Sequence, residues 1–545
     1  MARIGRRAVV AAGAAGLGAA ALGAGAVALR PERAIEGSLG GADFARGHRL
    51  RGAGFPAPSI ERTAPIVIVG GGVAGLSAAW TLAEAGVADF ALLELEDGPG
   101  GNARSGRNAI SAYPLGAHYL PIPNREAVGV RRLLEKLGII TGWEGGRPTF
   151  DPYQVVSDPE ERLLHLGRWQ EGLVPTLGLA PADRHDIDAF FVAMRAFRDR
   201  RGVDGRPAFA IPMDLSSRDP ELLALDRISF TQWMEAQGWR SKVLHAHVRY
   251  CCRDDYGTEP DQVSAWAGVH YFASRRGEAA NVDSDAVLTW PEGNGHLAAA
   301  LAKRVACYTV SGQIVHAVRR DGEGVIVDAF DATTGRTTRW RAKAVVLATP
   351  RFVTARICPE AVSAEGFAYA PWVVANVSVD RLPAGQGAAV AWDNVSWTSD
   401  SLGYVVATHQ GLAQAPGASV LTWYMPLSGM APGEARRIML ERPLAEWQKL
   451  VKADLLETNP DLVGAIRRID VWRWGHAMIR PVPGFLWDGR REAAAAAKPP
   501  FFFGHSDLSG MSIFEEAHYR GAMAAEGAMA HLGLHHVSQF RSEPA

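Results

Sequence analysis

The feature that most restricts the fold of this chain is a glycine-rich turn near residue 70, between an apolar run and a helix-forming segment. Residues 65–69 are rich in β-branched side chains and predict a strand, and residues 76–85 have the composition of a helix. The turn between them consists of Gly70, Gly71, Gly72, Val73, Ala74 and Gly75. Glycines at these spacings permit a tight turn, a close approach of pyrophosphate and close helix–strand packing. The pattern therefore predicts an α/β unit whose helix N-terminus binds a dinucleotide.

A second apolar run strengthens this prediction. Residues 90–93 predict the next strand, and Glu94 follows it, 24 residues after Gly70. A carboxylate at this spacing can accept hydrogen bonds from the ribose hydroxyls of the adenosine half. The alternative is an ordinary βαβ unit with a glycine turn and no ligand, which leaves the position of Glu94 without a role.

Composition excludes several other classes of protein. The 545 residues carry 57 basic and 58 acidic side chains, and this balance lacks the positive charge typical of a nucleic-acid binder. The four cysteines are too few for a disulfide framework, and their spacing fits neither a zinc site nor a redox pair. We therefore expect no metal site, and chemistry supplied by a bound cofactor and a small-molecule substrate.

Two motifs after Glu94 indicate which dinucleotide is bound. The first is a glycine pair followed by an arginine, at Gly100, Gly101 and Arg104, and the second comprises Gly116, Ala117, His118 and Tyr119. Together they resemble the flavin amine oxidase, protoporphyrinogen oxidase and phytoene desaturase superfamily. The resemblance implies FAD rather than NAD, with the glycine pair and Arg104 at the pyrophosphate. It also places His118 and Tyr119 beside the flavin ring, with His118 as a candidate catalytic residue, although either residue can equally be an ordinary packed side chain.

The resemblance continues in three later segments. Residues 290–297 resemble the glycine turn by which such chains return to the FAD domain, and residues 345–350 read Val-Val-Leu-Ala-Thr-Pro, a strand of the superfamily. Residues 500–525 resemble its closing strand, turn and helix. By this resemblance Val315 would offer its backbone to adenine. The ribityl chain and the pyrimidine edge of FAD would be held by Gly504, Ser506, Asp507, Ile513 and Phe514.

These motifs predict an α/β protein in which a Rossmann-like FAD-binding domain is interleaved with an α+β substrate domain. The FAD-binding domain is expected to comprise residues 64–130, 285–360 and 465–540. The substrate domain would comprise residues 131–284 and 361–464, with one amphipathic helix over residues 434–454.

The N-terminal segment predicts export from a bacterial cytoplasm. Arg3, Arg6 and Arg7 precede an uncharged Ala/Gly-rich stretch from residue 8 to 29, and the arginine pair resembles a twin-arginine signal. We therefore expect a twin-arginine-type signal over residues 1–30, recognition by the twin-arginine machinery, a linker over residues 31–63, and a periplasmic or extracytoplasmic location. The signal would be cleaved or would remain as a membrane tether. A buried Ala-rich helix is the alternative, and it leaves the arginines unexplained.

The resemblance implies hydride transfer from substrate to flavin, and leaves the substrate open. An aromatic pair found over the flavin in monoamine-oxidase-like members is missing, since Ile513 stands at one of its positions. Residues 369–381, where the superfamily's lysine is expected, contain no lysine, so an electron acceptor other than oxygen is an open alternative. His476 is expected near the flavin ring as a general base, a substrate orienter, a covalent flavin attachment or a packed histidine.

Three classes of function remain open on the sequence alone. The first is oxidation of an amine, with a polyamine as one candidate. Asp254 and Asp255 would attract the ammonium group or, alternatively, cap a helix or lie on the surface. The second is desaturase- or protoporphyrinogen-oxidase-like dehydrogenation of an apolar substrate, and the third is a non-catalytic flavin-binding scaffold. Arg480 would bind a substrate carboxylate or form a salt bridge between domains. An acidic, narrow tunnel would favour the amine, and a broad apolar pocket would favour the second class.

Overall fold

Three sheets organise the chain in the computed structural model, which describes residues 34–541 apart from residues 53, 362 and 412–416. The residues from Gly37 onward form one compact unit. The predicted export signal lies outside the described residues. None of the helices within the described ranges is both long and apolar enough to cross a membrane.

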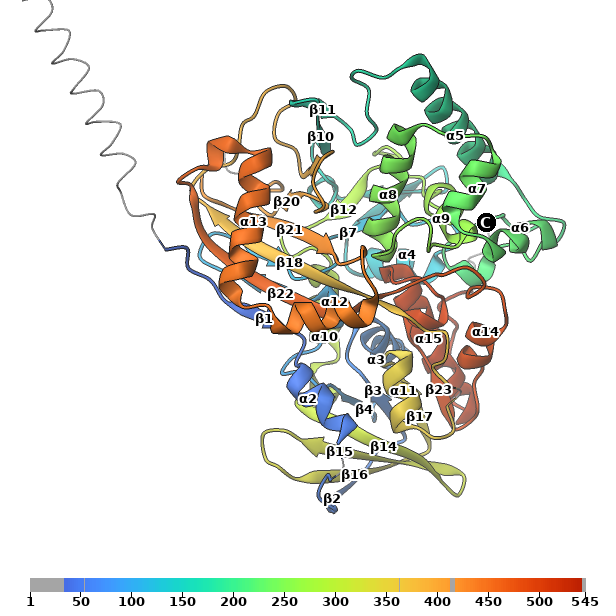
Figure 1. Ribbon diagram of the computed structural model, residues 1–545. Helices are drawn as coiled ribbons and strands as arrows, with labels where there is room; N and C mark the ends of the chain where they lie inside the picture. The colour runs from blue at the N-terminus through green and yellow to red at the C-terminus, as the bar shows by residue number, and fades with distance from the viewer. Residues whose placement is uncertain (1–33, 53, 362, 412–416, 542–545) are drawn as a thin grey trace, which may run out of the picture. The chain divides into compact units, whose positions relative to one another are not determined.

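The first sheet is five-stranded and parallel, and it contains the strand that precedes the glycine turn (Figure 1). Its order is β13 (Thr309–Val310), β4 (Ala91–Leu93), β3 (Ile66–Val69), β17 (Ala344–Leu347) and β23 (Phe501–Phe503). Strands from the N-terminal, middle and C-terminal parts of the chain thus meet in one sheet. This arrangement confirms the predicted fold class, in which a Rossmann-like sheet is interleaved with other structure.

Small residues let helices pack closely on this sheet. The helix α3 (Val73–Glu84) follows the glycine turn and is buried over most of its length between α10 (Gly295–Arg304) and α15 (Phe514–His531). A Cβ atom on Gly521 of α15 would lie 2.0 Å from the carbonyl oxygen of Ala74. The glycine therefore allows α15 to approach the first turn of α3.

A four-stranded sheet lies at the end of the molecule drawn lowest in Figure 1. A hairpin forms between β14 (Gln313–Asp321) and β15 (Gly324–Asp331), and β16 (Thr337–Ala342) and β2 (Pro58–Thr63) complete the sheet. Because β2 lies within residues 31–63, and β1 (Leu39–Gly41) and α2 (Phe44–His48) do as well, the prediction of a linker there is wrong for its described part. Each of the two strands joins a sheet built largely from distant segments.

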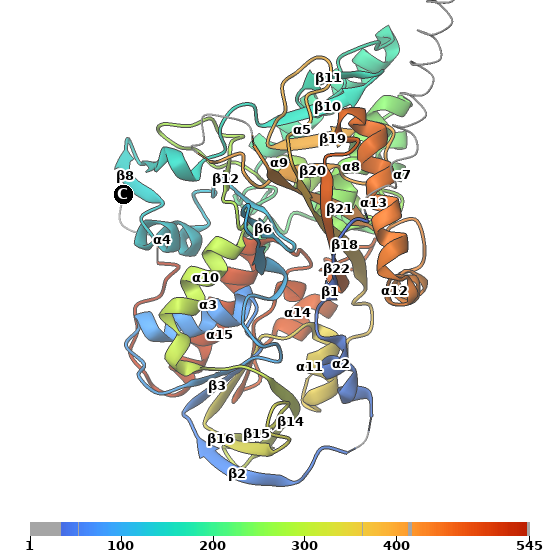
Figure 2. The ribbon, with the colours of Figure 1, turned by 90° about the vertical axis from the view of Figure 1, so that its left-hand side faces the viewer.

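The largest sheet has eight strands, and most of them lie in the predicted substrate domain. Its order is β1, β22 (Ile466–Ile479), β18 (Tyr369–Val379), β21 (Ser419–Pro426), β20 (Tyr404–Val406), β19 (Asp393–Ser396), β10 (Glu161–His165) and β11 (Arg168–Glu171). The helices α12 (Pro432–Glu441) and α13 (Leu444–Thr458) pack against β18 and β22 (Figures 1 and 2). The single helix predicted over residues 434–454 is therefore two helices, because Pro443 lies between them.

The strand β22 also shifts one predicted boundary. Residues 465–540 were expected to belong to the FAD-binding domain, but β22 pairs with β18 and β1 in the eight-stranded sheet. The other division points between the two domains stay predictions.

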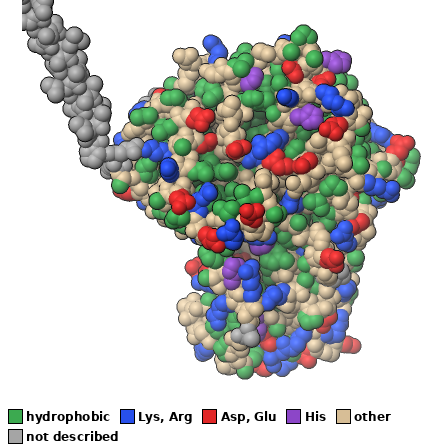
Figure 3. All heavy atoms as spheres, in the orientation of Figure 1, with side chains coloured by type: hydrophobic (Ala, Val, Ile, Leu, Met, Phe, Trp, Pro, Cys, Tyr) green, Lys and Arg blue, Asp and Glu red, His purple; other side chains and the backbone are tan. Residues whose placement is uncertain are grey.

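Helices close the remaining sides, and the described residues also form three two-stranded sheets. One pairs β7 (Tyr119–Pro121) with the distant β12 (Val287–Thr289), and the other two are hairpins of β5 (Ser105–Arg107) with β6 (Ala112–Pro114) and of β8 (Ile140–Glu144) with β9 (Arg147–Phe150). The other helices are α4 (Val128–Lys136), α5 (Pro181–Asp199), α6 (Pro220–Ala224), α7 (Phe230–Ala236), α8 (Lys242–Tyr256), α9 (Ala265–Ala273), α11 (Arg351–Ile357) and α14 (Arg490–Ala495). Acidic and basic side chains are interspersed over the face seen in Figure 3.

Candidate functional site

The predicted dinucleotide motifs surround one cavity of about 290 Å³. It lies where the glycine turn, the end of β4, the loop after β17 and the start of α15 meet. Thirteen of the predicted site residues line it: Gly70, Gly72, Val73, Ala74, Glu94, Gly101, Ala117, Val315, His476, Ser506, Asp507, Ile513 and Phe514. Motifs separated by more than 400 residues in the sequence thus share one cavity.

The two glycine motifs pack against each other along their backbones. The amide of Gly100 donates to the carbonyl oxygen of Gly71 at 2.8 Å. A Cβ atom on Gly101 would lie 3.0 Å from the Cα of Gly72, and one on Gly75 would lie 1.8 Å from the carbonyl oxygen of Gly70. Gly75 and Gly100 therefore shape the cavity without lining it, and so does Gly504, which packs against α15. These contacts leave backbone, rather than side chains, at the cavity wall.

Glu94 is buried at the end of β4 and faces this cavity. One of its carboxylate oxygens accepts from the amide of Gly71 at 2.5 Å, and the other accepts from the amide of Glu96 at 2.8 Å. Burial raises the pKa of Glu94, although the two amide bonds oppose this shift. Glu94 therefore ties the strand end to the glycine turn.

Arg104 does not line the cavity. Its guanidinium pairs with Glu96 at 3.3 Å and lies 5.3 Å and 5.7 Å from the ring centres of Trp472 and Trp474. The predicted role of Arg104 at the pyrophosphate therefore has no support from its position. The neighbouring Asn102 does line the cavity, and its side-chain amide donates to the carbonyl oxygen of Ala477 at 2.5 Å.

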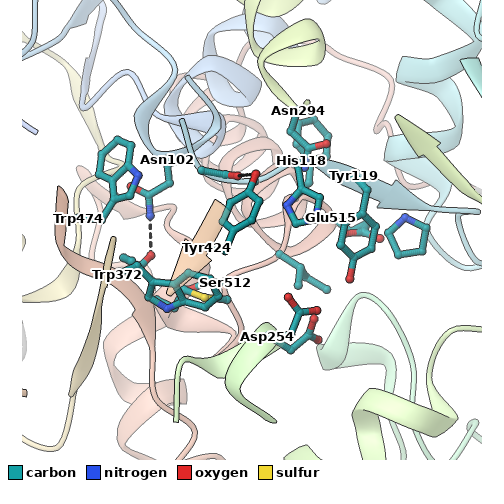
Figure 4. Close-up of a pocket in the computed structure, with 18 of the residues that line it drawn as sticks. Asn102, His118, Tyr119, Asp254, Asn294, Trp372, Tyr424, Trp474, Ser512 and Glu515 are labelled. Atoms are coloured by element: carbon teal, nitrogen blue, oxygen red, sulfur yellow. Dashed lines mark hydrogen bonds between the residues drawn. The ribbon is translucent and has the colours of Figure 1, made fainter. Parts of the chain in front are cut away.

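A second pocket of about 140 Å³ adjoins the first (Figure 4). The residues that line both are Asn102, Ala117, Asn294, Ala477, Ser512, Ile513 and Phe514. Gly116, His118 and Tyr119 line only the second pocket of these two, so the predicted flavin-side motif spans the junction. The wall also includes the aromatic residues Trp372 from β18, Tyr424 from β21 and Trp474 from β22. The eight-stranded sheet thus supplies one side of this pocket.

The end of α8 brings two carboxylates into the second pocket. Asp255 pairs with Arg275 at 2.8 Å, and Arg275 also donates to the hydroxyl of Tyr119 at 3.4 Å. Asp254 has no hydrogen bond or ion pair within the described part of the chain, and in Figure 4 its carboxylate lies across the pocket from Tyr424 and His118. Neither residue caps a helix nor lies on the outer surface, which resolves the alternatives left by the sequence.

These carboxylates are held in an unfavourable environment. Burial raises the pKa of Asp254, and repulsion by Asp255 raises it further, while Arg275 opposes the shift. Glu515, in the first turn of α15, lines the same pocket, and burial raises its pKa to about 7. The pocket therefore favours a bound cation, because a positive charge would stabilise the ionised carboxylates.

His118 and His476 occupy different cavities. Burial lowers the pKa of each to about 4, so both imidazoles are neutral at pH 7. The ring of His118 lies 4.7 Å from that of Tyr424 in the second pocket. His476 lies 4.3 Å from the ring of Phe352 and lines only the first cavity. The prediction that His476 acts as a base on the substrate is therefore not supported by its position.

Within the described part of the chain, Arg480 neither lines a pocket where it could bind a substrate carboxylate nor forms a salt bridge, the two roles expected of it. Its guanidinium donates to the side-chain oxygens of Thr258 at 3.1 Å and Gln262 at 2.5 Å. It lines neither cavity, and its partners are neutral. Arg480 therefore ties β22 to the loop after α8.

Sequence reasoning missed the aromatic walls of the second pocket. Trp372 and Tyr424 lie on strands that are buried almost throughout, so alternation of polar and apolar residues does not reveal their orientation. Arg275 and Glu515 were missed because only the tertiary fold brings them to Asp255. No local signal would have found them.

The residues present fit a flavin dinucleotide. The N-terminus of α3 opens onto the first cavity beside the glycine backbone, as a pyrophosphate requires. The side-chain oxygen of Asn294 is buried without a partner among the described residues, at the junction of the two cavities, where a ring carrying N–H groups can donate to it. The cavities together thus provide a phosphate cradle, a ribose partner and a polar contact for a ring.

Comparisons with known proteins agree with this fit. Solved structures with the same fold include wild-type putrescine oxidase bound to putrescine, with a TM-score of 0.63 at 15% identity, covering 86% of this chain and 100% of that chain. Cyclohexylamine oxidase from Brevibacterium oxydans IH-35A has a TM-score of 0.61 at 16% identity, with 86% and 99% covered. A CLA-producing fatty acid isomerase from P. acnes has a TM-score of 0.59 at 16% identity, with 85% and 98% covered.

The family itself is shown by a match along most of the sequence. A family model for flavin-containing amine oxidoreductases matches residues 73–526, from the first turn of α3 to the last turns of α15. The chain therefore belongs to the flavin-containing amine oxidoreductase family, as an oxidoreductase that depends on FAD.

Proposed function

We propose that this oxidoreductase acts on an amine, which it oxidises at the carbon next to nitrogen. The observation that carries the proposal is the Asp254 carboxylate, which has no partner among the described residues and lines the pocket adjoining the cofactor cavity. An ammonium group is the ligand that such a carboxylate would bind. A substrate without a cation would leave Asp254 buried and uncompensated.

The residues of the first cavity would hold FAD. Gly70, Gly72 and the N-terminus of α3 would take the pyrophosphate, and Glu94 and Val315 the adenosine. Ser506 and Asp507 would hold the ribityl chain, and Ile513 and Phe514 lie where the ring reaches the second pocket. When bound, FAD supplies a hydride acceptor for a C–H bond beside nitrogen.

The substrate pocket would orient the amine and exclude water. Asp254 would hold the ammonium and accept its proton, since the nitrogen lone pair must be free before the C–H bond breaks. The rings of Tyr119, Tyr424 and Trp372 would cover the carbon chain. His118 is neutral and packed among these rings, so its role would be to shape the pocket.

An anaerobic titration tests this proposal. The purified protein is mixed with monoamines, diamines, polyamines, amino acids and porphyrinogens while the flavin absorbance at about 450 nm is followed. We expect bleaching by amines, and admission of air then distinguishes an oxidase from a dehydrogenase that needs another acceptor. Bleaching by porphyrinogens alone would contradict the amine proposal, and no bleaching by any compound would favour a scaffold.

The activity is expected to fall in acid. The pKa of Asp254 is raised above its ordinary value of about 3.9, so the carboxylate becomes protonated at a higher pH than usual. Once protonated, it can no longer hold an ammonium group by charge. We therefore expect kcat/KM for an amine to fall as the pH is lowered from about 8 to about 5. The measurement is a pH profile of kcat/KM, and a profile flat over this range would contradict the assignment of Asp254.

The location of the enzyme is a separate part of the proposal. The paired residues Arg6 and Arg7 and the apolar stretch after them support export by the twin-arginine route, with the signal cleaved or kept as a tether. That route would place the oxidoreductase in the periplasm or outside the cytoplasm. Fractionation of cells that produce the full chain would test this location.

A further inference from the structure

A third cavity opens from the substrate pocket on the side away from the cofactor. Its volume is about 270 Å³, and we call it the outer chamber. The residues that it shares with the substrate pocket are His118, Tyr119, Pro121, Asp254, Arg275 and Tyr424. Asp254 thus lines both spaces, and a ligand held there can extend into either one.

Carboxylates outnumber cations in the wall of the outer chamber. Five acidic residues (Glu160, Glu161, Asp254, Asp285 and Asp393) stand against two arginines (Arg198 and Arg275). Arg275 is already paired with Asp255 at 2.8 Å. Asp285 is exposed, whereas Asp393 lies deeper, and its carboxylate accepts a long hydrogen bond of 3.4 Å from the hydroxyl of Tyr250 and one from the backbone amide of Asn394. The negative charge therefore runs from the surface inward to Asp254.

The fold holds these carboxylates together against their repulsion. The strands β10 and β19 pair side by side, which places Glu161 directly opposite Asp393. Burial raises the pKa of Glu161 to about 7 and that of Glu160 to about 8, and it raises the pKa of Asp393 strongly, with repulsion by Glu161 adding to the shift. This arrangement is costly unless a cation binds there.

Aromatic rings surround the passage between the outer chamber and the substrate pocket. The ring of Trp392, beside Asp393, lies 5.6 Å from that of His118 and 6.1 Å from that of Tyr119. Trp392 and Tyr424 are buried, with 6% and 4% of their surface exposed, and both line the outer chamber. Ring faces attract ammonium groups, and they also cover a methylene chain.

We infer that the outer chamber is a second cation site and that the substrate is a linear diamine or polyamine bound at two points. One nitrogen lies at Asp254 beside the cofactor cavity, the methylene chain passes Trp392 and Tyr424, and a second ammonium lies between Glu161 and Asp393. This inference rests on the proposed amine function and narrows its substrate class. Asp393 and Glu161 act on specificity and not on the chemical step.

The test compares diamines with monoamines of equal chain length on the FAD-loaded enzyme. For Asp393→Asn we expect KM for the preferred diamine to rise about tenfold or more, with kcat changed less than about twofold. KM for the matched n-alkyl monoamine should stay within about twofold. Glu161→Gln should likewise raise KM for the diamine and leave KM for the monoamine nearly unchanged. Asp283→Asn, at an exposed position two residues before Asp285, should leave KM for both substrates unchanged.

Stability measurements separate this role from a structural one. Because the pKa of Asp393 is raised in the folded protein, its ionised form lowers stability at pH 8, so Asp393→Asn should keep or raise the midpoint of thermal unfolding. If Asp393→Asn raised KM equally for the diamine and the monoamine, or raised it for neither, the inference would be overturned while the amine function stands. If no amine bleaches the flavin, the proposed function itself fails.

Discussion

Asp254→Asn is expected to lower kcat/KM for the amine substrate by about 100-fold or more. The substitution keeps the shape of the side chain and removes the charge that would hold the ammonium group, and losing one partner of a desolvated charge pair costs about 2–5 kcal/mol. Steady-state kinetics at pH 8, supported by the rate of anaerobic flavin bleaching, measure the effect. Because Asp254 lines the substrate pocket and not the cofactor cavity, the flavin content should stay unchanged.

Two controls make this result specific. Asp254→Glu keeps the charge and should recover a large part of the activity, and Asp188→Asn, at an exposed position on α5, should have no effect. The acid limb of the pH profile should also disappear in Asp254→Asn. An unchanged kcat/KM in this variant would remove Asp254 from the substrate site.

Gly75→Ala should yield a protein that lacks most of its FAD. The added Cβ atom would lie 1.8 Å from the carbonyl oxygen of Gly70, and both partners are backbone, so the turn and α3 must move apart. Overpacking of this kind costs about 1–3 kcal/mol or more, and the displacement occurs where the pyrophosphate would bind. The ratio of flavin to protein absorbance and the affinity of the stripped protein for FAD measure the loss.

The same substitution at another helix provides the control. Gly433 is the second residue of α12, and a Cβ atom there would meet no atom of the described residues within 4 Å. Gly433→Ala should therefore keep its FAD and its stability. If Gly75→Ala bound FAD as tightly as the unchanged protein, the close contact between the turn and the helix would have no importance for the cofactor.

The cofactor side could be predicted from the sequence because its signals are local. The glycine turn, Glu94 and the strand over residues 344–347 each combine a short pattern with a backbone requirement. The substrate side has no such patterns. The tertiary fold alone places Asp254 at a pocket wall and brings Arg275 to Asp255.

The errors in secondary structure have the same origin. The strands β1 and β2 were predicted as linker because each is short and obtains its hydrogen bonds from distant partners. His476 was expected near the flavin ring and lines the cofactor cavity, but its neighbours on β22 line the second pocket, which the sequence did not reveal. Which side of a strand meets a ligand cannot be read from its sequence when both sides are covered.

The positions of β22 and β23 set the order of events during synthesis. The eight-stranded sheet needs residues 466–479, and the parallel sheet needs residues 501–503 as its edge strand. Neither sheet can therefore close before the ribosome has delivered nearly the whole chain, and such long-range pairing is slow. Until then both the parallel sheet beside the cofactor cavity and the eight-stranded sheet beside the substrate pocket are incomplete. Loading of FAD would therefore follow translation, when both sheets that surround the active centre are complete.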